Sequence, residues 1–211
     1  MLRMKKNGKS LLRLTLFSLL ISSISISCND ATRNLELEPD EIVTVDALHL
    51  IPYPQEVEIG DGFFELNSTA EIQADELLDN EASYLTALFN AQLNNPIGQP
   101  NKNQLNSPPL IRLNKKAFDS KKAEYYELLI SPESINLNSA TNEGIMRGIQ
   151  TLRQLFVSAF SSNEKRDNWY LPCLRIQDEP QFNHRGLLLD VCRHFFSKEV
   201  ILKYIDALAF Y

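Results

Sequence analysis

The residues best equipped for chemistry lie together near the C-terminus, in the segment FNHRGLLLDVCRHFF (residues 182–196). An apolar run, Leu187–Leu189, separates Arg185 from a polar group made of Asp190, Arg193 and His194. Guanidinium, imidazole and carboxylate groups could hydrogen-bond a polar substrate there. Because the active sites of (β/α)8 barrels gather at the C-terminal ends of strands, spacing alone favours the group after the run over Arg185. We expect that group to form a structural hydrogen-bond cluster at the rim, with direct substrate contact as the alternative.

Other residues with reactive side chains give weaker signals. Asp178 and Glu179 form an adjacent acid pair, but they stand before Pro180 in a linker, so we do not expect them to be catalytic. The three histidines are scattered along the chain, which argues against a metal site. Cys173 and Cys192 are too few for a disulfide framework. We expect both thiols to be free and buried, with a disulfide between them as the alternative.

The apolar run has to be held by regular structure. A continuously apolar strand is typical of parallel sheets that are covered on both faces. Ser197 can cap a following helix, whose buried side is marked by apolar residues at helical spacing between Ile201 and Leu208. Strand followed by helix is the repeat unit of a (β/α)8 barrel, which typically needs about 250 residues. The chain stops at Tyr211 with only the first unit present, so we expect the front part of an enzyme, cut off where its catalytic domain begins.

Residues 50–178 predict a separate α+β domain, with a small, mainly antiparallel sheet and two helices on one face. Alternating patterns predict two hairpins, one turning at Gly60-Asp61-Gly62 and one at Ser131-Pro132-Glu133. Further short strands are expected over Glu71–Gln73, Leu110–Leu113, Trp169–Leu171 and Leu174–Ile176.

Apolar residues at helical spacing predict the two helices of this domain. One covers Asn80–Leu93, and the other runs from Asn142, which can serve as its cap, to Phe156. Gly144 and Gly148 lie in the first turns of the second helix, where each costs about 1 kcal/mol relative to alanine. That cost indicates close packing of this helix on the sheet.

The first 27 residues resemble a targeting signal rather than a structural element. A basic start precedes an apolar stretch that is too short and too rich in serine to span a bilayer. Small residues then lead to Cys28, as in a bacterial lipoprotein signal, whose cysteine is lipidated; an ordinary secretory signal is the alternative. In either case we expect an exported protein, in the bacterial periplasm or on the outer membrane. Residues 28–49 would be a solvated acidic tether.

The charge balance excludes one class of partner. The formal net charge is −6, and without the five basic residues of the signal, 16 basic residues face 27 acidic ones, a net charge of −11. Nucleic acid needs a basic footprint, so we expect no nucleic-acid partner. Contact with a membrane is expected through the lipid anchor only.

Several motifs of the chain resemble those of glycoside hydrolase family 20, the β-N-acetylhexosaminidases. The segment FNHRGLLLDV followed by RHFF (residues 182–196) resembles the start of the family's catalytic barrel. Upstream, IPYP (residues 51–54), the predicted strands around Tyr126 and Ile135, and GIMRGIQTLRQL (residues 144–155) resemble its non-catalytic N-terminal domain. The resemblance covers the chain from about residue 50 to its end.

The resemblance implies removal of terminal N-acetylglucosamine or N-acetylgalactosamine from glycans, with retention and substrate assistance. It implies no metal and no organic cofactor. The family's catalytic Asp-Glu pair stands on a later strand, so we expect no catalytic residue among these 211. The family residue assigned to this chain is Arg185, which the resemblance predicts to hydrogen-bond hydroxyls of the terminal sugar with its forked donor set.

Two alternatives stay open. The chain could be a non-catalytic glycan-binding or scaffolding lipoprotein that retains only the accessory domain. It could also belong to another hexosamine-directed hydrolase, such as an O-linked N-acetylglucosaminidase, although the sequence around Arg185 and Gly186 disfavours this. For the chain as it stands, we expect no hydrolase activity and poor solubility of the part beyond Phe182.

Overall fold

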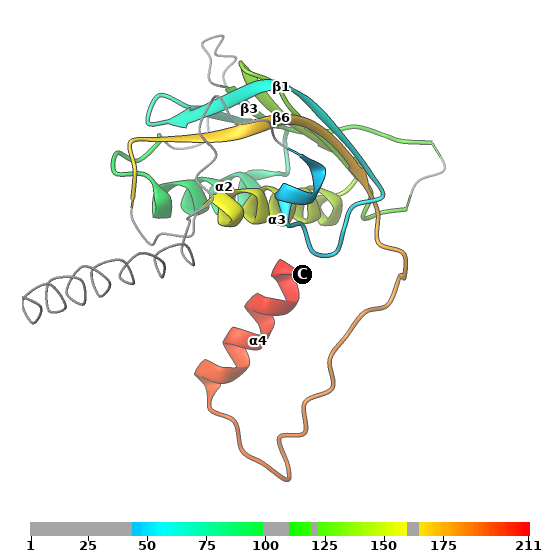
Figure 1. Ribbon diagram of the computed structural model, residues 1–211. Helices are drawn as coiled ribbons and strands as arrows, with labels where there is room; N and C mark the ends of the chain where they lie inside the picture. Colours follow the sequence, from blue (N-terminus) through cyan, green and yellow to red (C-terminus); the bar gives the residue numbers. More distant parts are fainter. Residues whose placement is uncertain (1–43, 99–109, 120–121, 160–164) are drawn as a thin grey trace, which may run out of the picture. The chain divides into compact units, whose positions relative to one another are not determined.

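The computed structural model describes residues 44–98, 110–119, 122–159 and 165–211. The predicted signal, Cys28 and most of the predicted tether lie outside these ranges. The central feature is a six-stranded sheet in the order β1-β6-β4-β5-β3-β2 (Figure 1). Its strands are β1 (Glu56–Asn67), β2 (Glu71–Ala74), β3 (Leu110–Lys115), β4 (Tyr126–Ile130), β5 (Ser134–Ser139) and β6 (Asn168–Asp178).

The sheet is mainly antiparallel, as predicted, but it is mixed: three of its five strand pairings are antiparallel and two are parallel. Strands β1, β6, β4 and β5 pair antiparallel, whereas β5–β3 and β3–β2 are parallel. Helix α2 (Asp79–Gln92) connects β2 to β3, which makes the β2-α2-β3 segment a βαβ crossover. The predicted hairpin of β4 and β5 is confirmed, with residues 131–134 turning the chain.

The first predicted hairpin is wrong. Residues Glu56–Asn67 form a single strand that pairs with β6 along its whole length, and the register shifts between Ile59 and Phe63. Gly62 has a φ of 88°, so the glycines that predicted a turn supply a β-bulge instead. Next to the bulge, Pro172 pairs with Phe63 inside β6, and this single strand joins the two short strands predicted on either side of Pro172.

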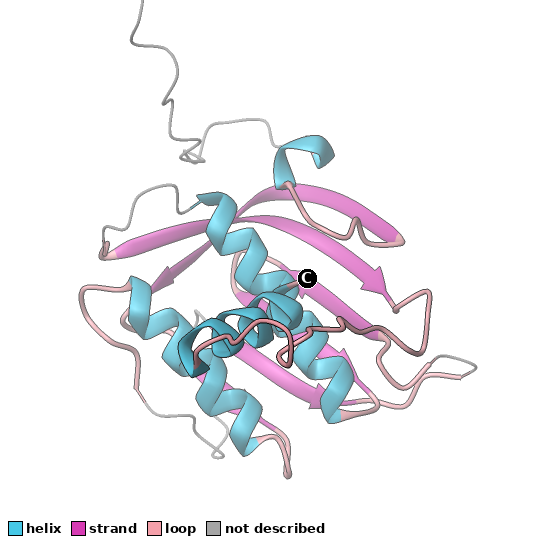
Figure 2. Ribbon diagram, turned by 90° about the horizontal axis from the view of Figure 1, so that it is seen from below, coloured by secondary structure: helices cyan, strands magenta, loops and turns pink. Residues whose placement is uncertain are grey.

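The two predicted helices are confirmed and cover one face of the sheet (Figures 1 and 2). Helix α3 (Asn142–Ala159) begins at a different cap from the predicted Asn142. The Thr141 hydroxyl accepts a hydrogen bond from the Gly144 amide at 3.1 Å, which makes Thr141 the capping residue. The Asn142 amide instead donates to the Leu77 carbonyl and to Glu81, which ties α3 to the start of α2.

Both helical glycines lie against the sheet, as their cost predicted. A Cβ on Gly144 would come within 2.0 Å of the Ser139 hydroxyl and 2.6 Å of the Tyr125 carbonyl. A Cβ on Gly148 would come within 2.2 Å of a methyl group of Leu137. The helix can approach the sheet this closely only because these two positions carry no side chain.

The folded domain begins earlier than predicted, before Leu50, because the last residues of the predicted tether are part of it. A short 3-10 helix, η1, spans Val45–Leu48, and both Leu48 and Leu50 are buried in the core. His49 between them is exposed and has a φ of 49°. The last residues of the predicted tether therefore belong to the fold.

The C-terminal segment is only half as predicted. Helix α4 (Lys198–Phe210) is present, but Leu187–Leu189 form no strand. Leu188 is 95% exposed. A parallel strand takes its ladder hydrogen bonds from neighbouring strands, and among the described residues no strand pairs with this run. Cys192 is free but exposed, which corrects its predicted burial; Cys173 is free and buried, as predicted.

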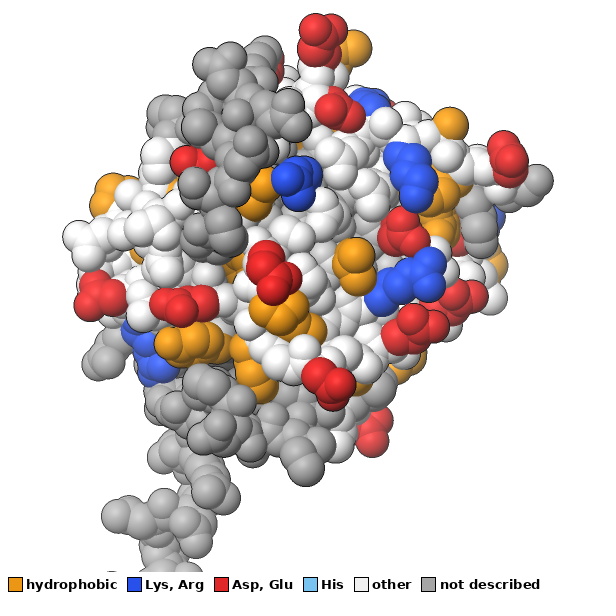
Figure 3. All heavy atoms as spheres, turned by 90° about the horizontal axis from the view of Figure 1, so that it is seen from above, with side chains coloured by type: hydrophobic (Ala, Val, Ile, Leu, Met, Phe, Trp, Pro, Cys, Tyr) orange, Lys and Arg blue, Asp and Glu red, His pale blue; other side chains and the backbone are white. Residues whose placement is uncertain are grey.

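The sheet face opposite the helices is polar. Figure 3 shows acidic and basic side chains interspersed there among uncharged ones. At its centre the Glu127 carboxylate accepts hydrogen bonds from Arg175 at 2.9 Å and Gln177 at 3.0 Å, with Lys116 at 3.5 Å. Burial acts to raise the pKa of Glu127, but Arg175 and Lys116 outweigh it and hold that pKa below the usual carboxyl value. Among the described helices, none has the length and apolar content that crossing a membrane requires.

Candidate functional site

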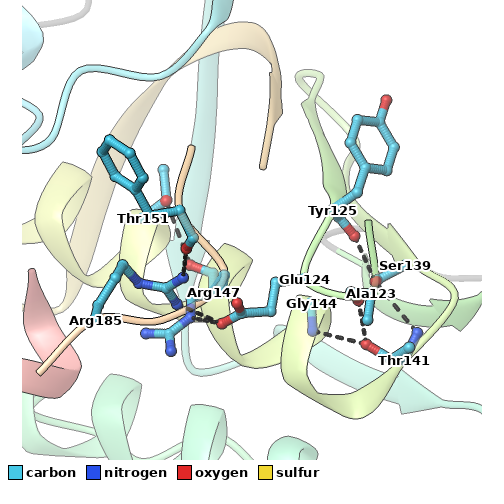
Figure 4. Close-up of polar contacts among 10 residues, drawn as sticks. Ala123, Glu124, Tyr125, Ser139, Thr141, Gly144, Arg147, Thr151 and Arg185 are labelled. Atoms are coloured by element: carbon cyan, nitrogen blue, oxygen red, sulfur yellow. Dashed lines mark hydrogen bonds and ion pairs between the residues drawn. The ribbon is translucent and has the colours of Figure 1, made fainter. Parts of the chain in front are cut away.

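The C-terminal segment is joined to the α+β domain by a shared carboxylate. Arg185 donates from Nη2 to Glu124 Oε1 at 2.6 Å and from Nη1 to the Phe182 carbonyl. Arg147 of α3 donates from Nε to the same Glu124 oxygen at 2.9 Å. Figure 4 shows both guanidinium groups turned toward Glu124. The hydrogen bond from Arg185 is the main reason that the pKa of Glu124 lies below the usual carboxyl value; burial opposes it and Arg147 adds to it.

The backbone on either side of Glu124 is fixed. The Thr141 hydroxyl donates to the Ala123 carbonyl, and the Ser139 hydroxyl donates to the Tyr125 carbonyl at 2.6 Å (Figure 4). Ser139 is fully buried. Since these two residues stand at the end of β5 and the start of α3, the same corner of the fold that caps the helix also places Glu124. Sequence reasoning missed Glu124, because an acidic residue in a polar loop carries no signal.

The polar group after the apolar run is partly assembled as predicted. Asp190 accepts hydrogen bonds from the amides of Cys192 and Arg193 at 3.0 and 3.1 Å and forms an ion pair with the Arg193 guanidinium. These hydrogen bonds, first that of the Arg193 amide, lower the pKa of Asp190. His194 takes no part in this pair and lies against the ring of Phe196. The Arg193 side chain is 90% exposed.

A cavity of about 280 Å³ lies beside this junction, between α3, the entry segment at Leu50–Pro54, and both ends of the C-terminal segment. The buried Tyr126 hydroxyl lies in its wall, 2.6 Å from the Thr151 hydroxyl. Asp178 lines it too, and burial raises the pKa of this carboxyl.

The acid pair Asp178-Glu179 has structural partners, but Asp178 does not lie in a linker as predicted: it is the last residue of β6 and pairs with Tyr126 of β4. Asp178 accepts a hydrogen bond from the Gln55 amide, and Glu179 accepts one from the Lys122 amide. Within the described ranges, no group of three His, Cys, Asp or Glu side chains could hold a metal ion.

Comparison with protein families gives this arrangement its context. The sequence model of domain 2 of glycosyl hydrolase family 20 matches residues 47–179, more than half of the chain. This chain belongs to glycoside hydrolase family 20. The model of the family's catalytic domain matches residues 182–211. The Arg185–Glu124 contact therefore joins the first residues matched by the catalytic model to domain 2.

Curated relatives in family 20 are several times longer than this chain. It is 35% identical over 150 residues to β-hexosaminidase subunit B1 of Dictyostelium discoideum, covering 69% of this chain and 26% of that protein. It is 33% identical over 171 residues to a β-hexosaminidase of Porphyromonas gingivalis, covering 78% of this chain and 21% of that protein. The chain thus spans about a quarter of the length of these relatives.

Solved structures of family 20 enzymes share the fold. The β-N-acetylhexosaminidase of Streptomyces coelicolor A3(2) superposes with a TM-score of 0.65 at 26% identity, covering 83% of this chain and 34% of that one. The N-acetyl-β-hexosaminidase of Streptomyces plicatus in complex with Thio-NAglucal gives 0.66 at 25% identity, covering 85% of this chain and 35% of that one. The mixed sheet with its helices fits the accessory domain of such enzymes, followed by part of the catalytic domain.

Proposed function

We propose that this chain supplies the accessory domain and the opening of the catalytic domain of an exported β-N-acetylhexosaminidase. The observation that carries the proposal is the order of the two family matches, with the catalytic domain beginning at residue 182, directly after domain 2 ends at residue 179. The proposed catalytic domain is a (β/α)8 barrel, whose first strand would be Leu187–Leu189 and whose first helix is α4.

The proposed substrates are glycans that end in N-acetylglucosamine or N-acetylgalactosamine. Family 20 enzymes are substrate-assisted exceptions among glycosidases. In that chemistry the substrate's own acetamido oxygen attacks the anomeric carbon, a glutamic acid protonates the leaving group, and an aspartate orients the acetamido group. We assign neither acid to a residue of this chain, so the 211 residues alone should bind or position but not hydrolyse.

Two arginines of the chain compete for contact with the sugar. The family resemblance predicts Arg185, but its guanidinium already holds Glu124 and the Phe182 carbonyl. Arg193 pairs with Asp190 through Nε, but its side chain is 90% exposed and follows the apolar run, at the end where barrel active sites gather. These contacts favour Arg193 as the sugar-binding arginine and give Arg185 the role of a link between the domains. Arg185 remains the candidate to test against it.

Activity is tested by release of a chromophore from an aryl N-acetylglucosaminide. We expect none from the 211-residue chain and hydrolysis by the product of the complete reading frame of its gene. Failure of that longer product to hydrolyse the substrate contradicts the proposal. A reading frame without further catalytic sequence would favour the alternative, a glycan-binding lipoprotein, which no present observation favours.

The two arginines are distinguished in the same longer product. Replacement of a sugar-binding arginine by lysine removes forked hydrogen bonds and should lower kcat/KM at least tenfold without changing the unfolding transition. Replacement of a linking arginine should lower the unfolding temperature and change kcat/KM less. We expect Arg193→Lys to behave in the first way and Arg185→Lys in the second; the reverse pattern restores the sugar contact to Arg185.

Export and anchoring rest on the sequence of the first 28 residues. We propose that Cys28 is lipidated and holds the protein on a bacterial membrane. Incorporation of an alkyne-bearing fatty acid into the parent protein, and its loss in Cys28→Ser, is the expected result. Export without incorporation would indicate the ordinary secretory signal instead.

A further inference from the structure

The second attachment of the C-terminal segment involves helix α4 and the neighbouring residues Arg153 and Gln154 of α3. Arg153 donates to Asp206 in the two-pronged arrangement, Nη1 to Oδ1 and Nη2 to Oδ2, both at 3.1 Å. The same guanidinium lies over the Phe210 ring, 4.7 Å from its centroid. Asp206 and Phe210 are four residues apart and therefore share one face of α4. One arginine thus defines both the position and the rotation of this helix.

Gln154 holds two distant parts of the chain at once. Its Oε1 accepts the Ile51 amide at 2.8 Å, and its Nε2 donates to the Ile51 carbonyl and to the Phe210 carbonyl, both at 2.7 Å. The Phe210 carbonyl is among the last four of its helix, which have no partner within the helix. Gln154 therefore joins the entry of the domain to the end of α4.

Apolar packing alone does not fix this placement of α4. No residue of α4 is fully buried: Val200, Ile201 and Phe210 are partly buried, and Leu202, Ile205 and Leu208 stay about half exposed, at 52%, 55% and 50%. Such contacts are also poor at selecting one rotation of a helix, since the hydrophobic effect has no direction. The directional bonds of Arg153 and Gln154 are what distinguish this placement from others.

We propose that α3 of the accessory domain is the docking element for the first helix of the catalytic domain, with Arg153 and Gln154 as positioning residues. Glu124 holds the start of the C-terminal segment through Arg185, while Arg153 and Gln154 hold its end through Asp206 and Phe210. Both ends of the first strand-and-helix unit are thus fixed by one domain. That this unit belongs to a hexosaminidase rests on the proposed function; the docking itself does not.

Hydrogen exchange of the 211-residue chain tests the docking without any enzyme assay. Loss of an ion pair at a partly exposed site is worth roughly a fivefold change in an equilibrium. We expect Arg153→Asp and Asp206→Arg each to speed exchange of the α4 amides about fivefold, while the amides of α2 stay unchanged. The double variant with both changes exchanges the two charges and should restore α4 protection to within about twofold.

The controls separate docking from general damage. Lys203→Ala removes a different charged side chain of α4, one that is exposed, and should leave exchange as it is. Arg153→Lys keeps the charge but loses the two-pronged geometry, so its effect should fall between the parent and Arg153→Asp. Faster exchange in α2 as well would mean global unfolding, in which case Arg153→Lys decides. Unchanged α4 exchange in the single variants, or no recovery in the double variant, overturns the proposal.

The role in catalysis is measured separately, in the longer product that hydrolyses the aryl substrate. Arg153→Asp should lower kcat, and the charge-exchanged double variant should recover it. If the exchange experiment succeeds and the longer product is inactive in its parent form, the docking holds and the hexosaminidase assignment fails. If hydrolysis is present but exchange shows no coupling, the assignment holds and the docking fails.

Discussion

Replacement of Gly144 by alanine tests how tightly the corner that places Glu124 is packed. The new Cβ would lie 2.0 Å from the Ser139 hydroxyl and 2.6 Å from the Tyr125 carbonyl. Ordinary contacts of a Cβ begin near 3.4 Å, so these atoms would have to move by 1.4 and 0.8 Å. One of them is backbone, and the two are joined by a 2.6 Å hydrogen bond, so neither moves alone.

The magnitude follows from three terms. Alanine favours the helix by about 1 kcal/mol over glycine. Overpacking a well-filled interior costs about 1–3 kcal/mol, and losing the buried Ser139–Tyr125 hydrogen bond costs about 1–3 kcal/mol more. We therefore expect Gly144→Ala to lower the free energy of unfolding by about 1–5 kcal/mol. Urea unfolding measures it, followed by fluorescence of the single tryptophan, Trp169, which is buried.

Two matched substitutions make the result interpretable. Gly148→Ala gains the same helix propensity, but its clash is with a side-chain methyl group of Leu137, which can rotate, so we expect a smaller loss of about 0–2 kcal/mol. Gly186→Ala meets no atom within 4 Å and should change stability by less than about 0.5 kcal/mol. The reasoning is refuted if Gly144→Ala is as stable as the parent, or if it is milder than Gly148→Ala.

Three further outcomes are expected. Thr141→Ala should lower the free energy of unfolding by about 1 kcal/mol, because it removes the cap of α3. Asn142→Ala should leave that cap in place, so an equal loss of helix in both variants would identify Asn142 as the cap. Tyr126→Phe should cost about 1 kcal/mol, since it removes the hydrogen bond between the buried Tyr126 side chain and the partly buried Thr151 hydroxyl; urea unfolding of both proteins checks it, and a neutral result contradicts it. Glu127→Gln should destabilise the protein by about 1 kcal/mol near pH 7. Because the folded pKa of Glu127 is lowered, its contribution is complete above the ordinary carboxyl value and is lost as pH falls through the folded value, so parent and variant should converge at pH values below the folded pKa. A difference in stability between parent and variant that persists there would mean that the negative charge of Glu127 is not what stabilises the protein.

Elements with a strong periodic pattern of apolar residues could be predicted from the sequence. Elements whose residue pattern fits two different structures could not. Helices over residues 79–92 and 142–159 were predictable because an apolar stripe at helical spacing has one interpretation. The pattern of Gly60 and Gly62 has two interpretations. A positive φ, which Gly62 adopts, occurs in a hairpin turn and in a β-bulge alike. The parallel pairing of β2, β3 and β5 was also hidden, because β-strand patterns do not record which strand lies alongside.

The candidate site could likewise be predicted only in part. The resemblance of the motif to family 20 led to the right family, because that inference needs only the order of residues. The partner of Arg185 could not be predicted, since Glu124 lies 61 positions earlier and meets it only after β4, β5 and α3 have folded. The predicted strand Leu187–Leu189 fails for a related reason: an apolar run can be extended by its own sequence, but a ladder needs a second strand beside it.

The proposed tasks of the two arginines place them on either side of one short segment. Residues 191–194 form turns, so at most the stretch from Arg185 to Asp190 can be extended, which spans about 17 Å. That length suits one strand of the proposed barrel, with Arg185 before it and Arg193 after it. Arg185 is held at the accessory domain by Glu124, so it marks the N-terminal end, where a barrel is stabilised. In the proposed barrel, Arg193 would lie at the opposite end, where active sites gather. A change in the accessory domain can therefore reach the sugar only by moving this unit as a body, which is the reason that both of its ends need a fixed partner.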